Sequence, residues 1–233
     1  MKTPIQFENI KCITLDLDDT LWPVGPTIIK AETELYSWMK KNYPEVSNTY
    51  THQQLTEKRM VLQASRKDIS HDVTEVRYCS LLELGKEFGY DEEFAKQAMT
   101  LFRYYRNQVE PYESCESILS ILKRHFILGA ITNGNVQLDQ IPIGEYFDFV
   151  VTAEEVGVCK PHSKMFEVAS QFADVPLSDI LHIGDSVKTD VIGAMDAGCK
   201  AIWFNDKRAP WPGGQNPHHV VHCLTELPAV LNI

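Results

Sequence analysis

Strand-like and helix-like segments alternate through most of this chain, and the alternation limits the folds it can adopt. Apolar runs predict buried strands at residues 11–17, 127–131, 147–151, 180–183, 201–204 and 219–222. Amphipathic patterns predict helices at residues 114–124, 163–172 and 189–197, the last of which ends before Gly198. Strands that alternate with helices form a parallel sheet that is covered on both faces. We therefore expect an α/β fold with a doubly wound, Rossmann-like parallel sheet.

One long segment interrupts this alternation, because residues 26–109 contain no convincing strand-like run. Helical patterns occur there at residues 27–40, 51–63, 73–88 and 92–106. The run Asp72-Val73-Thr74-Glu75 has the spacing of a capping box, and Gly89 is suited to ending the helix that follows. We expect an all-helical subdomain at residues 23–109, inserted into an α/β core of residues 1–22 and 110–233.

Composition narrows the class of protein. The 233 residues are 44% hydrophobic, which suits a large core, and the net charge of −10 argues against nonspecific binding of nucleic acid. No apolar run is long enough to span a bilayer, and the N-terminus lacks a signal-peptide pattern. The six cysteines have neither zinc-like nor disulfide-framework spacing, so we expect reduced, mostly buried thiols in a cytoplasmic protein. The sequence is compatible with either a monomer or a homodimer. The Pro- and Gly-rich segment 210–217 is expected to be a surface loop.

Three carboxylates lie at the end of the first predicted strand, at Asp16, Asp18 and Asp19. Crowded carboxylates repel one another, so such a group at a strand end usually has a compensating cation. Side chains at the carboxyl end of a parallel strand reach the crevice where α/β proteins bind ligands. The functional hypothesis is that Asp16 attacks phosphorus to form an aspartyl-phosphate, while Asp18 protonates the leaving oxygen. The alternative is an acidic turn that Asp19 caps.

Two further motifs supply groups that bind anions. Thr132, Asn133 and Gly134 follow the strand at 127–131, where a hydroxyl and backbone amides can hold a phosphoryl oxygen. An ordinary Asn-Gly turn is the alternative. Lys160 can neutralise Asp16 and a transferring phosphoryl group, unless it is a solvated surface lysine. Pro161, which follows it, is expected to begin the next helix at its first turn.

The last motif follows the strand at 180–183. Asp185 is suited to binding a magnesium ion directly. Asp190, near the start of the next helix, is expected to orient Lys160 or a water on the metal. The alternative for Asp190 is a carboxylate favoured by the helix dipole, and both roles can hold together.

In their order along the chain, these four motifs resemble those of the haloacid dehalogenase-like superfamily, and the helical insertion resembles that superfamily's small cap. The resemblance implies that Asp16 is the nucleophile and that Mg²⁺ is held by the Asp16 and Asp185 side chains and by the backbone carbonyl of Asp18. Thr132 and Lys160 match the remaining catalytic positions. Dehalogenases of the superfamily lack the second aspartate and need no magnesium, so Asp18 favours phosphoryl transfer.

Four segments are similar to bacterial flavin mononucleotide phosphatases, some of which also dephosphorylate the ribityl-pyrimidine phosphate precursor of riboflavin. These segments are residues 14–21, 71–74, 130–135 and 180–190. The resemblance implies a small phosphomonoester substrate, with flavin mononucleotide or that precursor as the leading hypothesis, and hence a role in riboflavin biosynthesis.

Candidate substrate contacts near or in the cap are Trp22, His71, Arg77, Tyr104 and Arg106. Each has a plainer alternative, since Trp22 can simply pack and Arg77, Arg103 and Arg106 can be solvated or form salt bridges. Other reactions of the superfamily also stay open: hydrolysis of a sugar phosphate or a nucleotide, phosphomutase chemistry, and dehalogenation. A catalytically idle fold that binds a protein partner is the remaining alternative.

Overall fold

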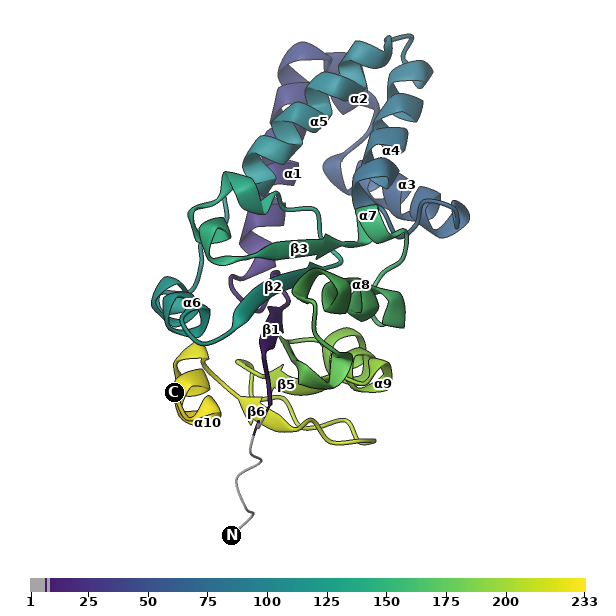
Figure 1. Cartoon of the computed structure of the whole chain (residues 1–233). Coiled ribbons are helices and arrows are strands. Elements are labelled where there is room, and N and C mark those ends of the chain that lie inside the picture. The colour runs from purple at the N-terminus through teal and green to yellow at the C-terminus, as the bar shows by residue number, and fades with distance from the viewer. Residues whose placement is uncertain (1–6, 8) are drawn as a thin grey trace. The chain divides into compact units, whose positions relative to one another are not determined.

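The computed structural model describes residue 7 and residues 9–233, and the chain separates into two compact units (Figure 1). The α/β unit comprises Met1–Pro23, Pro111–Gly134 and Leu138–Ile233. The helical unit comprises Val24–Glu110 together with Asn135–Gln137. That the helical unit acts as a cap stays a prediction.

Within the described residues, six parallel strands form the sheet of the α/β unit in the order β3-β2-β1-β4-β5-β6 (Figure 1). The strands are β1 (Cys12–Leu15), β2 (Ile127–Thr132), β3 (Phe149–Thr152), β4 (Ile180–Gly184), β5 (Lys200–Phe204) and β6 (His219–Val221). The predicted fold class, a Rossmann-like parallel α/β sheet, is confirmed. Every residue of β1 is buried, as expected for a central strand that is covered on both faces.

The register of the central strands brings the predicted motifs to one edge of the sheet. Leu15, the last residue of β1, lies opposite Ala130 in β2 and Ile183 in β4. The carboxyl ends of β1, β2 and β4, which lie one or two residues beyond these positions or at them, are therefore side by side. Ligands of open α/β sheets bind outside the carboxyl ends of such strands.

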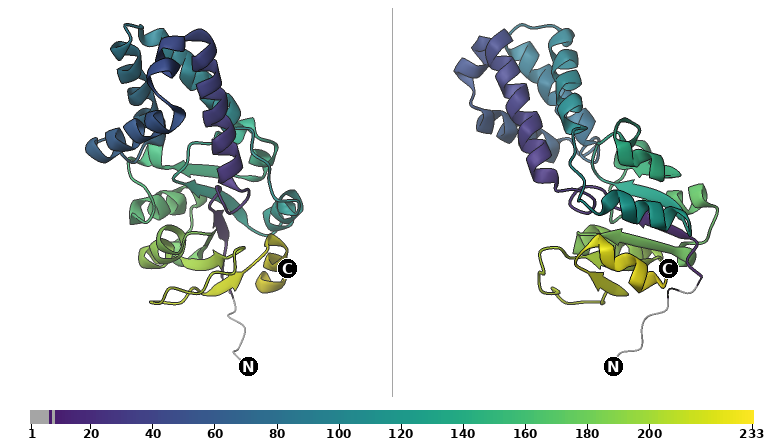
Figure 2. Two further views of the ribbon diagram at one scale, coloured as in Figure 1. Left: turned by 180° about the vertical axis from the view of Figure 1, so that it is seen from behind. Right: turned by 90° about the vertical axis from the view of Figure 1, so that its left-hand side faces the viewer.

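Helices cover both faces of this sheet (Figure 2). Helices α6 (Cys115–Lys123) and α10 (Leu227–Leu231) pack together on one face, and α8 (Ser163–Ala173) and α9 (Gly193–Ala197) pack together on the other. The buried side chains of α8 are Met165, Phe166, Ala169 and Ala173, which is the spacing of one helix face. The unit also contains the short α7 (Ala153–Val156) and 3₁₀ turns at Leu138–Gln140, Pro142–Tyr146, Leu177–Asp179 and Leu224–Glu226.

Two local details differ from the prediction. The helix expected at residues 189–197 begins as a π-helical turn, Val187–Ile192, before α9. Pro161 does not begin α8, because the helix starts at Ser163 and its N-cap is His162, whose Nδ1 accepts from the backbone N–H of Lys164. Gly198, with φ of 99°, ends α9 as predicted.

The helical unit contains α1 (Val24–Asn42), α2 (Pro44–Thr49), α3 (His52–Ser65), α4 (Val73–Glu87) and α5 (Glu92–Arg106). Four of these helices were predicted, and the short α2 was missed. The core of the unit lies between α1, α4 and α5, where Leu35, Met39, Leu84, Phe94 and Phe102 are buried. An aromatic group of Trp38, Tyr43 and Tyr90 surrounds Phe94.

The helix ends of this unit follow local sequence signals. Asp72 caps α4, because its Oδ1 accepts from the backbone N–H groups of Thr74 and Glu75 at 2.9 and 2.8 Å. Glu75 does not complete the predicted capping box, since its Oε1 accepts from the Sγ of Cys79 instead. A complete capping box joins Thr51 and Gln54 at the start of α3. Gly89, with φ of 77°, ends α4 as predicted.

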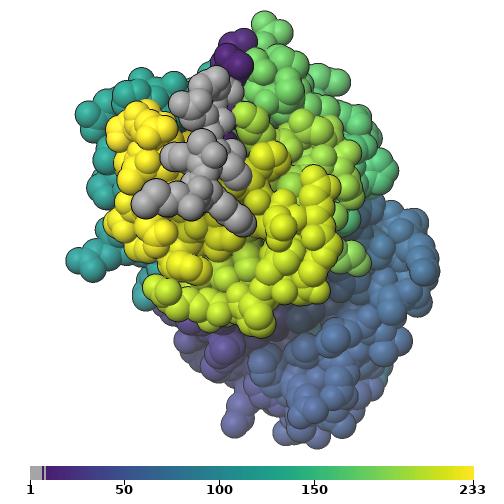
Figure 3. Space-filling view, turned by 90° about the horizontal axis from the view of Figure 1, so that it is seen from below, coloured from purple at the N-terminus to yellow at the C-terminus, as the bar shows by residue number. Residues whose placement is uncertain are grey.

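The predicted loop at residues 210–217 contains no helix or strand and lies on the face of the α/β unit seen in Figure 3. In the described part of the chain the cysteines form no disulfide, and Cys12, Cys115 and Cys199 are buried. Over residue 7 and residues 9–233, none of the helices is both long and apolar enough for a membrane span.

Candidate active site

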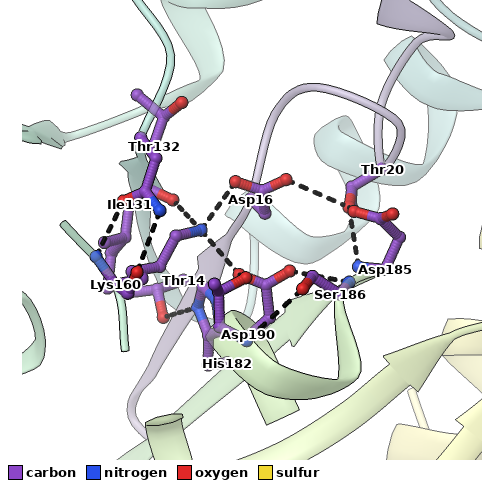
Figure 4. A network of polar contacts seen from close by, with 12 residues as sticks. Thr14, Asp16, Thr20, Ile131, Thr132, Lys160, His182, Asp185, Ser186 and Asp190 are labelled. Atoms are coloured by element: carbon purple, nitrogen blue, oxygen red, sulfur yellow. Dashed lines mark hydrogen bonds and ion pairs between the residues drawn. The ribbon is translucent and has the colours of Figure 1, made fainter. Parts of the chain in front are cut away.

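The carboxyl ends of β1, β2 and β4 carry three of the four motifs, and Lys160, in the segment between α7 and α8, contacts them there (Figure 4). Asp16 follows β1 directly, and its backbone N–H donates to the carbonyl oxygen of Ile183 at 2.9 Å. Thr132 is the last residue of β2, and Asp185 follows the last residue of β4. The positions of these side chains thus follow from the strand register.

Lys160 lies at the centre of the polar network. Its side chain is 1% exposed, and its Nζ donates to Asp16 Oδ1 and to the carbonyl oxygen of Ile131, both at 2.6 Å. The same Nζ lies 2.8 Å from Asp190 Oδ1. The alternative of a solvated surface lysine is therefore excluded.

The segment Thr132–Gly134 holds the backbone of Lys160. The side-chain Oδ1 of Asn133 accepts from the Lys160 backbone N–H at 2.7 Å, and its Nδ2 donates to the Lys160 carbonyl oxygen at 3.0 Å. The Thr132 hydroxyl accepts from the backbone N–H of Gly134 at 2.9 Å. The alternative of a hairpin turn fails, because β2 and β3 are parallel. The expected phosphate-binding role of Asn133 and Gly134 stays a prediction that concerns their backbone amides.

Asp190 connects Lys160 to the loop that carries Asp185. Its Oδ2 accepts from the backbone N–H of Ser186 at 2.9 Å, while its Oδ1 faces Lys160. Asp190 is almost completely buried. This geometry is compatible with the orienting role of Asp190, which stays a prediction.

Two buried residues below this network were missed by the sequence analysis. His182 in β4 lies opposite Thr14 in β1, and its Nδ1 is 2.9 Å from the Thr14 hydroxyl. Its Nε2 is 3.5 Å from Asp190 Oδ1. Because a carboxylate only accepts, we assign the imidazole proton to Nε2, which leaves Nδ1 to accept from Thr14. The sequence does contain a signal that could have identified them, because each is a polar residue inside an otherwise apolar strand.

Thr20 was quoted only as part of the first motif, yet it bridges two motifs. Its Oγ1 accepts from the backbone N–H of Asp185 at 3.1 Å. The same oxygen lies 3.5 Å from one carboxylate oxygen of Asp16 and 3.5 Å from one of Asp185. The hydroxyl therefore holds the first and fourth motifs together.

Burial and mutual repulsion disfavour the charged forms of two site carboxyl groups. Burial raises the pKa of Asp16 to about 8, although the ion pair with Lys160 opposes this change. Burial and the charge of Asp190 raise the pKa of Asp185 to about 6. The nearby lysine charge does not fully offset burial for Asp16, and Asp185 is repelled by Asp190, so a bound cation would favour the ionised form of both groups.

The other buried groups have pKa values that fit a stable ion pair. Burial alone would raise the pKa of Asp190, but the charge of Lys160 outweighs it and the pKa is lowered. Burial alone would lower the pKa of Lys160, but Asp16 and Asp190 outweigh it and the pKa is raised. Burial lowers the pKa of His182, so the imidazole stays neutral.

The acidic groups can hold a metal ion. Asp16, Asp185 and Asp190 each offer a carboxylate oxygen, and these oxygens lie within 4.8 Å of one another. The predicted ligands Asp16 and Asp185 belong to this group, whereas both Asp190 oxygens already face Lys160 and Ser186. An all-oxygen donor set of this kind fits a hard cation such as Mg²⁺.

The remaining predicted site residues are described within their own units. Trp22, in the α/β unit, is fully buried, and its Nε1 donates to Asp18 Oδ1 at 2.9 Å. In the helical unit, His71 lies just before α4 and is half-buried, and Tyr104 is exposed. For these residues, contact with substrate stays a prediction.

Arg77 and Arg106 of the helical unit are buried, so the alternative of solvated helix faces is wrong for both. Arg77 donates from Nη2 to Glu32 Oε1 at 2.8 Å and stacks 3.5 Å above the centre of the Phe102 ring. Arg106 donates from Nε to Asn135 Oδ1 at 3.1 Å. The salt bridge that was the alternative for Arg77 is therefore present, and contact of Arg77 or Arg106 with substrate stays a prediction.

Comparisons with known proteins identify the family of this chain. Residues 10–198 match the haloacid dehalogenase-like hydrolase family. The chain is 32% identical over 231 residues to the 5-amino-6-(5-phospho-D-ribitylamino)uracil phosphatase YigB of Escherichia coli K12, covering 96% of this chain and 97% of YigB. It is 35% identical over 127 residues to the pyrimidine 5'-nucleotidase YjjG of the same organism, covering 52% of this chain and 56% of YjjG.

A solved structure titled 2-haloacid dehalogenase, from Pseudomonas syringae pv. Tomato DC3000, superposes with a TM-score of 0.91 at 33% identity. The match covers 96% of this chain and 98% of that one. The chain belongs to the haloacid dehalogenase-like hydrolase family. The predicted superfamily and the predicted enzyme class, a phosphoric monoester hydrolase, are confirmed.

Proposed function

We propose that this protein is a magnesium-dependent phosphatase that hydrolyses a small phosphomonoester through an aspartyl-phosphate on Asp16. The leading substrate is the ribityl-pyrimidine phosphate precursor of riboflavin, with flavin mononucleotide second. The observation that carries the proposal is the buried Lys160 Nζ, which lies 2.6 Å from Asp16 Oδ1 at the carboxyl end of the sheet. The YigB relative, named for that precursor and matched over nearly its full length, supports the substrate.

The residues of the chain supply each chemical role. Asp16 attacks phosphorus as the bond from phosphorus to the leaving oxygen breaks, and Asp18 gives that oxygen a proton. Lys160 and the hydroxyl of Thr132 stabilise negative charge on the transferring group. Asp18 then takes a proton from the water that cleaves the aspartyl-phosphate. Asn133 and Asp190 hold Lys160 in place through the contacts described above.

The residues that would hold Mg²⁺ are Asp16 and Asp185 through their carboxylates and Asp18 through its backbone carbonyl. The raised pKa values of Asp16 and Asp185 support this assignment, because both groups need a cation nearby to be ionised together. When bound, the ion offsets charge on the carboxylates and on the phosphoryl oxygens.

Dehalogenation is the second candidate, because a structure 33% identical to this chain is titled 2-haloacid dehalogenase. That reaction needs a carboxylate that attacks carbon, which Asp16 also offers, and it does not need the proton carrier at Asp18. The presence of Asp18 therefore favours phosphatase activity. The match to a pyrimidine 5'-nucleotidase keeps a nucleotide substrate within the same class.

The test is a substrate panel assayed with magnesium and with a chelator. The panel contains the riboflavin precursor, flavin mononucleotide, a pyrimidine nucleotide, a sugar phosphate and a 2-haloacid. We expect phosphate release that needs magnesium and is fastest with the precursor. Halide release without magnesium, and no phosphate release, would overturn the proposal.

The matched variants are Asp16→Asn and Asp19→Asn. Asp16→Asn removes the nucleophile, so phosphate release should fall below detection while the thermal unfolding curve stays close to that of the wild type. Asp19 lies in the same loop with φ of 61°, a conformation that asparagine tolerates well, so Asp19→Asn should keep most of the activity. Equal activity of the Asp16→Asn and Asp19→Asn variants would contradict the proposed nucleophile.

A further inference from the structure

The indole of Trp22 is a buried hydrogen-bond donor that lies against the proposed acid/base residue. The Trp22 side chain is 0% exposed, and its Nε1 donates to Asp18 Oδ1 at 2.9 Å. Asp18 itself is half-buried. A buried indole N–H usually needs a partner, and here that partner is one oxygen of the group expected to carry protons.

The backbone between the two residues fixes this contact. The backbone N–H of Asp19 donates to the carbonyl oxygen of Trp22 at 2.7 Å, and an isolated parallel bridge pairs Asp18 with Trp22. The backbone N–H of Leu21 donates to the carbonyl oxygen of Leu17 at 2.8 Å. The indole has little freedom to move, because its ring is buried and these hydrogen bonds fix the backbone around it. The ring therefore sets the orientation of the Asp18 carboxyl group.

The chemistry of the two groups then decides which oxygen can hold a transferable proton. An indole N–H only donates, so the oxygen that receives it must act as an acceptor. A protonated carboxyl group has a single O–H, and with Oδ1 facing Trp22 that proton belongs on Oδ2. The contact to Trp22 is compatible with both the protonated and the ionised form of Asp18.

We propose that Trp22 is a positioning residue that holds Oδ1 of Asp18 and so presents Oδ2 to the leaving oxygen of the substrate. The proposal rests on the proposed function. In the first step the Oδ2–H proton passes to the leaving oxygen as its bond to phosphorus breaks and the bond from Asp16 to phosphorus forms. In the second step the water oxygen bonds to phosphorus as the bond from Asp16 to phosphorus breaks, and Oδ2 takes a proton from that water. Release of inorganic phosphate restores the starting state.

The test compares leaving groups in the Trp22→Phe variant. Phenylalanine keeps most of the packing and loses the N–H. p-Nitrophenolate leaves with little need of a proton, whereas an alkoxide needs one. We therefore compare kcat/KM, which covers the steps up to departure of the alcohol, for p-nitrophenyl phosphate and for the best alkyl phosphomonoester of the substrate panel.

We expect Trp22→Phe to lower kcat/KM about 10-fold for the alkyl ester, a fraction of the roughly 10²- to 10⁴-fold that a general acid contributes, and much less for p-nitrophenyl phosphate. Asp18→Asn should show the same preference more strongly. Adding Trp22→Phe to Asp18→Asn should cause no further selective loss, because the two residues act as a unit. Trp38→Phe, in the aromatic group of the helical unit, is the matched control and should affect both esters equally.

An equal loss on both esters in Trp22→Phe, together with a selective loss in Asp18→Asn, would overturn the positioning role and leave the proposed function intact. No selective loss in Asp18→Asn would instead refute the acid role of Asp18 in the proposed function. A second measurement, the NMR chemical shift of the Trp22 indole N–H, does not depend on whether Trp22→Phe folds. It should change in Asp18→Ala, and an unchanged resonance would also overturn the proposal.

Discussion

Replacing Lys160 by methionine tests whether a buried cation holds the candidate site together. The Lys160 Nζ contacts Asp16 Oδ1, Asp190 Oδ1 and the Ile131 carbonyl oxygen at 2.6, 2.8 and 2.6 Å. Methionine has a similar length and volume, so Lys160→Met removes the charge and three polar contacts without opening a large cavity. The effect of the variant therefore reports electrostatics more than packing.

The expected magnitude follows from the burial of the partners. Asp16 and Asp190 would stay buried with no cation beside them. Removing one partner of a buried ion pair typically costs about 3–5 kcal/mol, because the remaining charge is left uncompensated. For a chain of this size, 1 kcal/mol corresponds to roughly 2–4 °C in Tm, so we expect the α/β unit to melt roughly 6–20 °C lower. Loss of one charge-stabilising donor should also lower kcat about 10²- to 10³-fold.

The assay is calorimetric unfolding in a buffer with chelator, followed by phosphate release with magnesium. Lys164→Met is the matched control, because Lys164 is exposed and its Nζ makes one hydrogen bond, to the Val156 carbonyl oxygen. The double variant Lys160→Met/Asp190→Asn should regain part of the lost stability, since it removes a buried carboxyl group that has lost its cation. A Tm for Lys160→Met equal to that of Lys164→Met would refute the reasoning.

Two further predictions concern buried polar groups outside the reacting centre. Glu32→Gln should destabilise the helical unit by about 3–5 kcal/mol, because it leaves the buried Arg77 without its carboxylate partner. Burial alone would raise the pKa of Glu32, but Arg77 and Arg59 outweigh it and lower the pKa below its ordinary value of 4.5. Its contribution is therefore present above pH 4.5 and is lost as the pH falls through the lowered value. Circular dichroism melts at pH 7 and pH 3 should show a smaller acid-induced loss in Glu32→Gln than in the wild type, and an equal loss would contradict the ion pair. Thr14→Val should cost about 1–3 kcal/mol in urea unfolding, because it leaves Nδ1 of the buried His182 without a donor, whereas Thr14→Ser should cost less. Equal losses in the two Thr14 variants would argue against the assigned hydrogen bond.

The sequence determined the sheet and the edge at which chemistry can occur. Strand-like runs were found near every observed strand, although the first was expected to reach residue 17 and β1 ends at Leu15. Polar side chains lie at or just after the ends of three of these strands, β1, β2 and β4. Parallel strands present their carboxyl ends at one edge, so Asp16, Thr132 and Asp185 could be expected to meet before any coordinates existed. Helix ends at Asp72 and Gly89 were likewise readable, because capping depends on residues only a few positions apart.

Tertiary structure alone decided the partners of these side chains. Lys160 and Asp16 are separated by 144 positions, so their contact could be suggested by the set of motifs but not by any local pattern. Thr14 and His182 are separated by 168 positions, and their contact was missed. The burial of Arg77 beside Glu32, 45 positions away, was missed for the same reason, since an arginine on a helix looks the same in sequence whether it faces water or a buried carboxylate. Periodicity fixes which face of an element is apolar, but the charge that a buried group meets depends on strand register and helix packing.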